Sequence, residues 1–237
     1  MDINTFLQEI IKDITNKIKL SCVMQFGSST YSKDPRDIDL VLFSKEKVLK
    51  TREIISLIQI IKENEKENKD IVFDFGGLDR KRDSPYKITL IFLASCELQI
   101  EHNPHDLFFL KNLTEDKTIR ILYGKNPLRK LKIELSNKHL LEMLSVDLKH
   151  TLRKSLDDEK YKLEAIYALF KTFLRAMLIN FKIFKKNELL NNFKSKYGKL
   201  IALPTESNRI LQHNLETKDF EEILIFCERC LDFLVIK

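Results

Sequence analysis

The stretch FGSSTYSKDPRDIDLVLF, from Phe26 to Phe43, decides how this chain is interpreted. It begins where an apolar, strand-like run (LSCVMQF) ends, and it contains Gly27, one of only 5 glycines among the 237 residues. Asp37 and Asp39 then stand at alternate positions of a second apolar run. Because strand side chains alternate between the two faces of a sheet, both carboxylates should lie on one face. Two adjacent like charges are costly unless a cation lies between them, so the pattern predicts a metal site.

The turn between these two strands predicts a phosphate-binding loop. Gly27 permits a sharp turn, and Ser28 and Ser29 then present hydroxyl groups and backbone amides that suit phosphate oxygens. Carboxylates, water and phosphate oxygens are the ligands that Mg²⁺ prefers. A phosphate loop beside metal-binding carboxylates suits phosphoryl transfer, in which catalysis consists mainly of positioning and charge neutralisation.

A two-ion version of such a site requires a third carboxylate. Asp74 is the main candidate, because in the apolar run IVFDF it shares a strand face with Val72, while the other apolar side chains take the opposite face. An aspartate in the middle of an apolar strand is costly without a partner. Asp70 is the alternative, since it stands at the mouth of the same strand after a charged run.

Together these motifs resemble those of the nucleotidyltransferase superfamily, the DNA polymerase beta-like fold. Gly27 and Ser28 match its Gly-Ser pair, Asp37 and Asp39 match its Asp-x-Asp, and Asp74 matches the acid on a later strand. The resemblance implies two Mg²⁺ or Mn²⁺ ions bound by these three catalytic aspartates. It also implies that the first two acids bind both ions, while the third binds one ion and helps to activate the attacking hydroxyl.

The pattern of apolar residues predicts an α+β fold in two domains. Helical and strand-like runs alternate up to about residue 100, which predicts a small mixed sheet with flanking helices. Long helical patterns follow, including one that begins at Ser136 as an N-cap and one whose apolar stripe ends at Phe181. We therefore expect a nucleotidyltransferase catalytic domain at 1–125 and an all-helical C-terminal domain at 126–237. The helical part also resembles the tail of aminoglycoside nucleotidyltransferase-type proteins.

Basic residues provide candidates for binding phosphate groups. Lys171 and Arg175 stand four residues apart beside an apolar helical stripe. Because members of the superfamily use a basic residue of the helical part on the triphosphate, both are nucleotide-binding candidates; a solvated helix edge is the alternative. The net charge of +6 and a pI near 9.0 favour anionic partners. Two basic clusters could follow a nucleic-acid backbone: Arg80, Lys81, Arg82, Arg129, Lys130 and Lys132.

The resemblance implies transfer of a nucleoside monophosphate from an NTP such as ATP to an acceptor hydroxyl, with release of pyrophosphate. The basic charge favours RNA, such as a tRNA 3′ end, as the acceptor. An antibiotic-like small molecule or a protein is the alternative acceptor. A non-catalytic NTP-binding or RNA-binding module of the same fold is the alternative from a different functional class.

The rest of the sequence predicts an ordinary intracellular protein. The start of the chain lacks the pattern of a secretory signal, and no apolar run is long enough for a membrane span, so we expect a soluble, cytoplasmic protein without a membrane partner. Cys227 and Cys230 have metal-ligand spacing but lie in a helical pattern, which favours buried structural thiols over a zinc or redox site.

Overall fold

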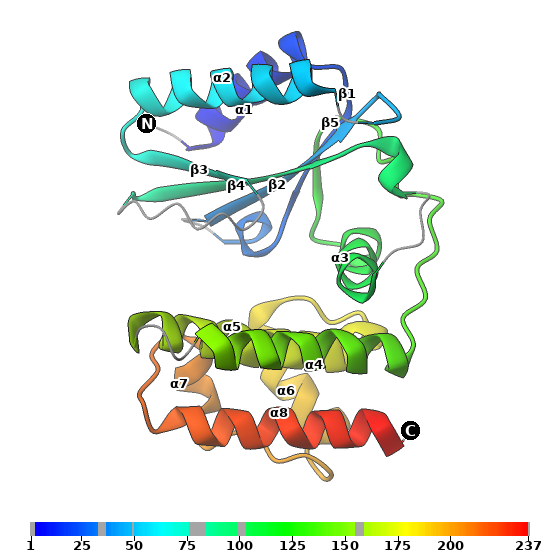
Figure 1. Cartoon of the computed structure of the whole chain (residues 1–237), viewed down its shortest axis with the longest axis vertical. Helices are drawn as coiled ribbons and strands as arrows, with labels where there is room; N and C mark the ends of the chain where they lie inside the picture. Colours follow the sequence, from blue (N-terminus) through cyan, green and yellow to red (C-terminus); the bar gives the residue numbers. More distant parts are fainter. Residues whose placement is uncertain are drawn as a thin grey trace. The chain divides into compact units, whose positions relative to one another are not determined.

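The computed structural model forms two compact units (Figure 1). It describes residues 3–32, 37–48, 50–75, 84–98, 103–154 and 159–236. The first unit comprises Met1–Glu101 and Lys117–Leu131, and the second comprises His102–Asp116 and Lys132–Lys237. The chain therefore leaves the first unit, contributes one helix to the second, and returns before it leaves again.

The first unit is built on a mixed β-sheet. Its strands are β1 (Leu20–Phe26), β2 (Asp37–Ser44), β3 (Ile71–Phe75), β4 (Tyr86–Leu93) and β5 (Arg120–Gly124). Its helices are α1 (Ile3–Lys17) and α2 (Thr51–Glu67), and its 3₁₀ turns are η1 (Ser28–Thr30) and η2 (Ser95–Leu98). The strands lie in the order β3-β4-β2-β1-β5. β4 is parallel to β2 and β3, whereas β1 is antiparallel to β2 and β5.

Helices α1 and α2 cover one face of this sheet (Figure 1). In β2, β3 and β4 the side chains alternate between the two faces of the sheet, so every second residue joins the core under the helices. From the central strands, Ile38, Leu40, Ile88 and Leu90 join this core. Asp37 and Asp39 therefore belong to the opposite face of the sheet, as the alternation of β2 predicts.

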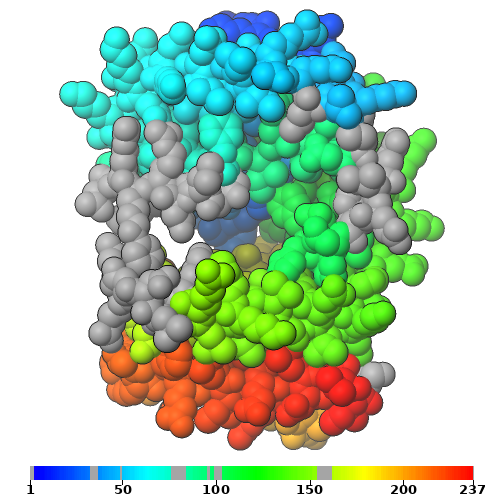
Figure 2. Space-filling view, in the orientation of Figure 1, coloured from blue at the N-terminus to red at the C-terminus, as the bar shows by residue number. Residues whose placement is uncertain are grey.

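The outer side of α2 also carries apolar residues. Figure 2 shows the side chains of α2, in cyan, on the surface of the first unit. Ile54, Ile55 and Ile58 are exposed there, while Leu57 and Ile60 are buried against the sheet. The apolar surface of α2 is therefore wider than the stripe that the sheet covers.

The second unit is helical throughout its described part. Its elements are α3 (Pro104–Glu115), α4 (Asn137–Lys154), α5 (Glu159–Leu178), η3 (Ile179–Phe181), α6 (Lys186–Tyr197), α7 (Ser207–Leu211) and α8 (Asp219–Ile236). Phe226 of α8 packs edge-to-face against Phe170 of α5 and Phe193 of α6, with ring centroids 5.3 Å apart in both pairs. These buried rings join helices that are distant in sequence.

Two of the helix boundaries test the sequence-based expectations directly. Ser136 is an N-cap, since its hydroxyl oxygen accepts the backbone N–H of His139 at 3.2 Å, and this prediction is confirmed. The placement of Phe181 on the stripe of α5 is wrong. The α-helix ends at Leu178, and Lys182 adopts a left-handed conformation with φ 59°. Phe181 is consequently 44% exposed.

Cys227 and Cys230 are both buried on α8, as expected for structural thiols. Within the ranges that the structure describes, no helix has the length and apolar character needed to cross a bilayer.

Candidate active site

The sheet register brings the three predicted catalytic aspartates to one face. Strand β4 lies between β2 and β3, and Thr89 of β4 pairs with Asp39 on one side and with Asp74 on the other. Laterally paired residues of a parallel sheet point to the same face, and so do residues two apart in a strand. Asp37 therefore shares this face as well. With strands about 4.8 Å apart, the Cα atoms of Asp39 and Asp74 are separated by about 10 Å.

Gly27 is required where it stands because the Asp39 carboxylate lies against it. Phe26 pairs with Asp39, so the turn after β1 begins beside this side chain. A Cβ atom on Gly27 would lie 2.6 Å from Asp39 Oδ2, and the backbone there has a φ of +74°. Both features exclude an ordinary side chain. This turn therefore gives the Asp39 carboxylate room to lie over it.

The serines of this turn have different environments. Ser28 is exposed, whereas Ser29 is buried. The Ser29 hydroxyl donates to Phe26 O at 3.2 Å and accepts from Gln25 Nε2 at 3.1 Å. Thr30 donates through Oγ1 to Gly27 O at 2.8 Å. Ser29 and Thr30 thus stabilise the turn from inside, while Ser28 lies on its outer side.

Asp74 is a buried carboxylate, and only one of its two oxygens has a partner among the described residues. It is 2% exposed, and its Oδ2 lies 3.2 Å from Nζ of Lys87, a residue of β4. Its Oδ1 is buried without a hydrogen-bond partner among the described residues. Buried carboxylate oxygens are rarely left unpaired, because their desolvation is costly. Within the described residues, Oδ1 is therefore a candidate ligand for a cation.

The strand that carries Asp74 is an edge strand held by a second buried acid. Glu65 of α2 accepts the backbone N–H of Phe73 through Oε1 at 2.9 Å. An edge strand presents backbone donors that must otherwise find water. Glu65 therefore anchors β3 to α2 one residue before Asp74.

Lys87 and Thr89 are the residues of this face that sequence reasoning missed. They occupy alternate positions in YKITLIFL, with apolar residues between and after them. The same alternation identified Asp37 and Asp39 on β2, so the signal was present in β4 too. The pattern in β4 indicates site residues only because β4 lies between the acid-bearing strands β2 and β3.

The donor chemistry of this face fits a divalent metal ion. Carboxylate oxygens are hard ligands, and Asp74 Oδ1 is an orphaned buried acceptor. In the part of the chain that the structure describes, however, no three His, Cys, Asp or Glu side chains converge closely enough to hold an ion. The sheet backbone therefore places the three aspartates on one face, while the carboxylate of Asp74 contacts Lys87.

The remaining predicted residues lie in several places. Asp70 is exposed in the turn before β3. Lys171 and Arg175 belong to α5 of the second unit, where Lys171 Nζ lies 5.1 Å from the centroid of the Tyr167 ring. Arg175 Nε is buried without a hydrogen-bond partner in the described part of the chain. Their role in nucleotide binding stays a prediction.

The two basic clusters differ in what the structure describes of them. Arg129, Lys130 and Lys132 are exposed. The cluster Arg80, Lys81 and Arg82 lies outside the described residues. Contact of either cluster with nucleic acid stays a prediction.

Comparison with solved structures identifies a similar protein, a spectinomycin adenyltransferase from Enterococcus faecialis, whose structure contains ATP and spectinomycin. The TM-score is 0.60 at 17% sequence identity, over 94% of this chain and 98% of the other. No protein-family model matches the chain, and no curated protein matches its sequence. The likeness extends through both units and confirms the predicted α+β, nucleotidyltransferase-like fold.

Proposed function

We propose that this chain is a metal-dependent nucleotidyltransferase that moves a nucleoside monophosphate from an NTP to an acceptor hydroxyl and releases pyrophosphate. The observation that carries the proposal is the register of β2, β4 and β3, which aligns Asp37, Asp39 and Asp74 on one face. The solved adenyltransferase of the same fold contains ATP, which supports ATP as the donor.

The aspartates have distinct proposed roles. Asp37, Asp39 and Asp74 would bind Mg²⁺ or Mn²⁺, two ions by the resemblance, and the bound metal would neutralise the charge that develops on the phosphates. Asp74 Oδ1 accepts the proton of the acceptor hydroxyl, and the resulting oxygen forms a bond to the α-phosphorus. The bond between that phosphorus and the bridging oxygen breaks, so pyrophosphate leaves. Gly27 and Ser28 form the turn that faces the phosphates, and Ser29 supports it.

We propose a small polar molecule with a free hydroxyl as the acceptor. The support is that the solved adenyltransferase of this fold contains spectinomycin, a small molecule, and that the likeness covers both units. RNA is the second candidate, supported by the net charge of +6 and by the exposed Arg129, Lys130 and Lys132.

The activity is tested with α-labelled NTPs, Mg²⁺ or Mn²⁺, and two acceptor pools: a panel of aminocyclitol and aminoglycoside compounds, and total RNA. We expect label transfer from ATP together with pyrophosphate release. Asp39→Asn should lower the transfer rate by about 10³-fold or more, because it removes a metal ligand that the transition state requires. Asp70→Asn is the matched control and should keep the wild-type rate. Equal rates in the wild type and Asp39→Asn would contradict the proposal.

Salt dependence distinguishes the two acceptor classes. Binding of RNA through a few phosphate contacts should weaken by roughly tenfold or more between about 50 and 200 mM salt, because each contact releases a counterion. An uncharged small acceptor should show almost no such change. The measurement is the acceptor KM at saturating NTP and metal, in the wild type and in a variant with Arg129, Lys130 and Lys132 changed to alanine. A steep salt dependence that this variant loses would replace the small molecule with RNA.

A further inference from the structure

Lys87 is the cationic side chain that the described sheet places among the three aspartates. Its Cα pairs with Asp37 of β2 on one side and with Val72 of β3 on the other. Its side chain crosses diagonally to β3, where Nζ lies 3.2 Å from Asp74 Oδ2. The ammonium group thus extends from a position beside one acid to contact another.

The contact between Lys87 and Asp74 is asymmetric in burial. Asp74 is 2% exposed, whereas the side chain of Lys87 is 35% exposed. A buried carboxylate needs a compensating charge, but a partly exposed lysine can return its ammonium to water at little cost. The pair therefore consists of a fixed anion and a cation that can leave.

The pair also leaves half of the carboxylate unused. Lys87 contacts only Oδ2, and Oδ1 has no hydrogen-bond partner among the described residues. A contact that served stability alone would be expected to satisfy both oxygens, because each unpaired buried oxygen costs free energy. Oδ1 is thus an acceptor for which the described residues provide no partner.

We propose that Lys87 is a resident counterion of the catalytic face, which compensates Asp74 in the metal-free protein and releases it when a divalent cation binds. This inference rests on the proposed metal-dependent function. It explains why the three acids lie on one face of the sheet although their carboxylates do not converge. Lys87 is thus a positioning residue that competes with the metal for the third carboxylate.

The competition predicts an order of metal affinities that an ordinary structural ion pair would not produce. In Lys87→Met the competing charge is gone, so Mn²⁺ should bind about tenfold more tightly than to the wild type. In Lys87→Arg the planar guanidinium can hold both carboxylate oxygens, so Mn²⁺ should bind severalfold more weakly. Lys12→Met removes the same charge from an exposed position of α1 and should leave the affinity unchanged.

The experiment is a titration of the metal-free full-length protein with Mn²⁺, in which free Mn²⁺ is measured by electron paramagnetic resonance. Thermal unfolding with and without Mn²⁺ accompanies it. Lys87→Met should have a lower Tm than the wild type without metal, and Mn²⁺ should raise its Tm by more. Because Lys87→Arg keeps the charge, its weaker binding tests the proposal even if Lys87→Met unfolds.

Two results would overturn the proposal in different ways. If Asp39→Asn abolishes Mn²⁺ binding but the Lys87→Met and Lys87→Arg variants bind like the wild type, Lys87 is only a structural partner and the proposed function stands. If the wild type itself binds no Mn²⁺, the metal-dependent function and the counterion both fall.

Discussion

Among the residues that the structure describes, each unit buries one aspartate almost completely, and the two aspartates differ in how their oxygens are paired. In the first unit, Asp74 is 2% exposed, and Nζ of Lys87 lies 3.2 Å from its Oδ2. In the second unit, Asp219 is 3% exposed at the start of α8, and both of its oxygens accept from Arg209 Nη2, at 2.6 and 2.8 Å. Asp219 Oδ2 also accepts the backbone N–H of Glu216 at 2.7 Å.

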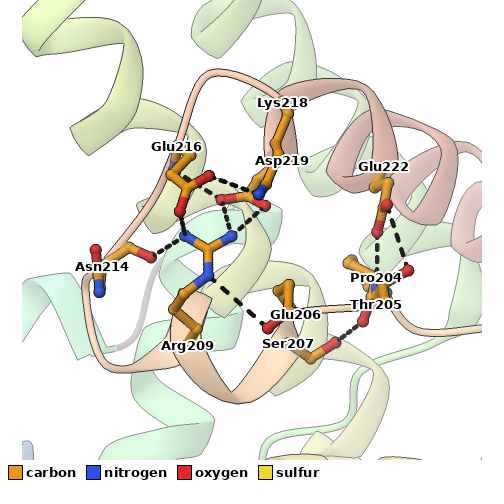
Figure 3. A network of polar contacts seen from close by, with 10 residues as sticks. All are labelled: Pro204, Thr205, Glu206, Ser207, Arg209, Asn214, Glu216, Lys218, Asp219 and Glu222. Atoms are coloured by element: carbon orange, nitrogen blue, oxygen red, sulfur yellow. Dashed lines mark hydrogen bonds and ion pairs between the residues drawn. The ribbon is translucent and has the colours of Figure 1, made fainter.

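The surroundings of Arg209, the partner of Asp219, extend this difference. Figure 3 shows Arg209 within a ring of acceptors, which includes Asn214 and Glu216 as well as Asp219. Arg209 donates through Nη1 to the carbonyl oxygen of Asn214 at 2.8 Å and lies 3.3 Å from Glu216 Oε1. A saturated network of this kind joins α7 to α8 and specifies a single arrangement. Asp74, by contrast, keeps Oδ1 without a hydrogen-bond partner among the described residues, and it is the carboxylate that we propose to bind a metal.

The largest expected effect comes from Asp74→Asn. The amide cannot accept a proton from the acceptor or bind a metal as a carboxylate does, so turnover should fall by about 10³-fold or more. The free energy of unfolding should stay the same or rise, because a neutral side chain needs no counter-charge. Transfer of labelled nucleotide and urea unfolding measure the two quantities. Turnover within tenfold of the wild type would place the third acid elsewhere, with Asp70 as the next candidate.

Asp219→Asn should give the opposite result. Breaking a buried ion pair by removing one partner typically costs about 3–5 kcal/mol, because the remaining charge is left uncompensated. We therefore expect a marked loss in the free energy of unfolding, measured in urea, with a near-normal turnover per folded molecule. Glu216→Gln changes an exposed neighbour in the same network and should leave unfolding nearly unchanged. Equal stability of Asp219→Asn and the wild type would show that the network does not support the second unit.

Gly27→Ala should lower both turnover and the free energy of unfolding, each by less than the aspartate variant that lowers it most. A positive φ costs an ordinary residue about 1–2 kcal/mol, and the new Cβ would displace the Asp39 carboxylate from its present position. We expect a turnover loss of about tenfold to a hundredfold, since misplaced catalytic groups can cost that much. Gly124→Ala, at the edge strand β5, has a similar φ of +73°, but its Cβ would lie 2.0 Å from the backbone oxygen of Ser21, so it should lose more stability than Gly27→Ala. Turnover per folded molecule is therefore the quantity compared. If the two variants lose turnover equally, the Gly27 turn has no special role.

The smallest effect concerns thiols, which both units bury in the same way. Burial raises the pKa of Cys22 to about 11 and also raises the pKa of Cys227 and Cys230. The thiolate fraction of Cys22 at pH 8 should therefore be about a hundredfold below that of an unfolded thiol. Alkylation with iodoacetamide, mapped by mass spectrometry, should be correspondingly slow in the native protein and fast in urea. Rapid labelling of Cys227 and Cys230 in the native protein would instead support a redox or metal-binding role for this pair.

These thiols also predict a direction for stability against pH. The folded state keeps protons that unfolded thiols release above their ordinary pKa of 9.0. The unfolded state therefore binds fewer protons, and the free energy of unfolding should fall as the pH rises from about 9 toward 11. Urea unfolding at pH 8 and pH 10 measures this change. A higher free energy of unfolding at pH 10 than at pH 8 would contradict the burial of these thiols in the folded state.

Several features were predictable because they depend on local backbone geometry. Alternation in β2 and β3 correctly separated the acids from the residues that pack under the helices, such as Ile38 and Phe73. The N-cap at Ser136 was predictable because the hydroxyl bonds to a backbone amide only three residues away. The end of α5 was not predictable, because the residue in the left-handed conformation is Lys182 and not a glycine, which is the usual sequence signal for a helix end.

The sequence by itself thus determined which residues share a strand face, and with it the three candidate acids and the class of fold. Only the tertiary structure decided that β4 lies between β2 and β3, which places Lys87 and Thr89 among those acids. It also decided that Asp219 pairs with Arg209, while Asp74 Oδ1 has no hydrogen-bond partner among the described residues. The physical reason is that alternation is a property of each strand alone, whereas strand order and ion pairing depend on contacts between distant segments.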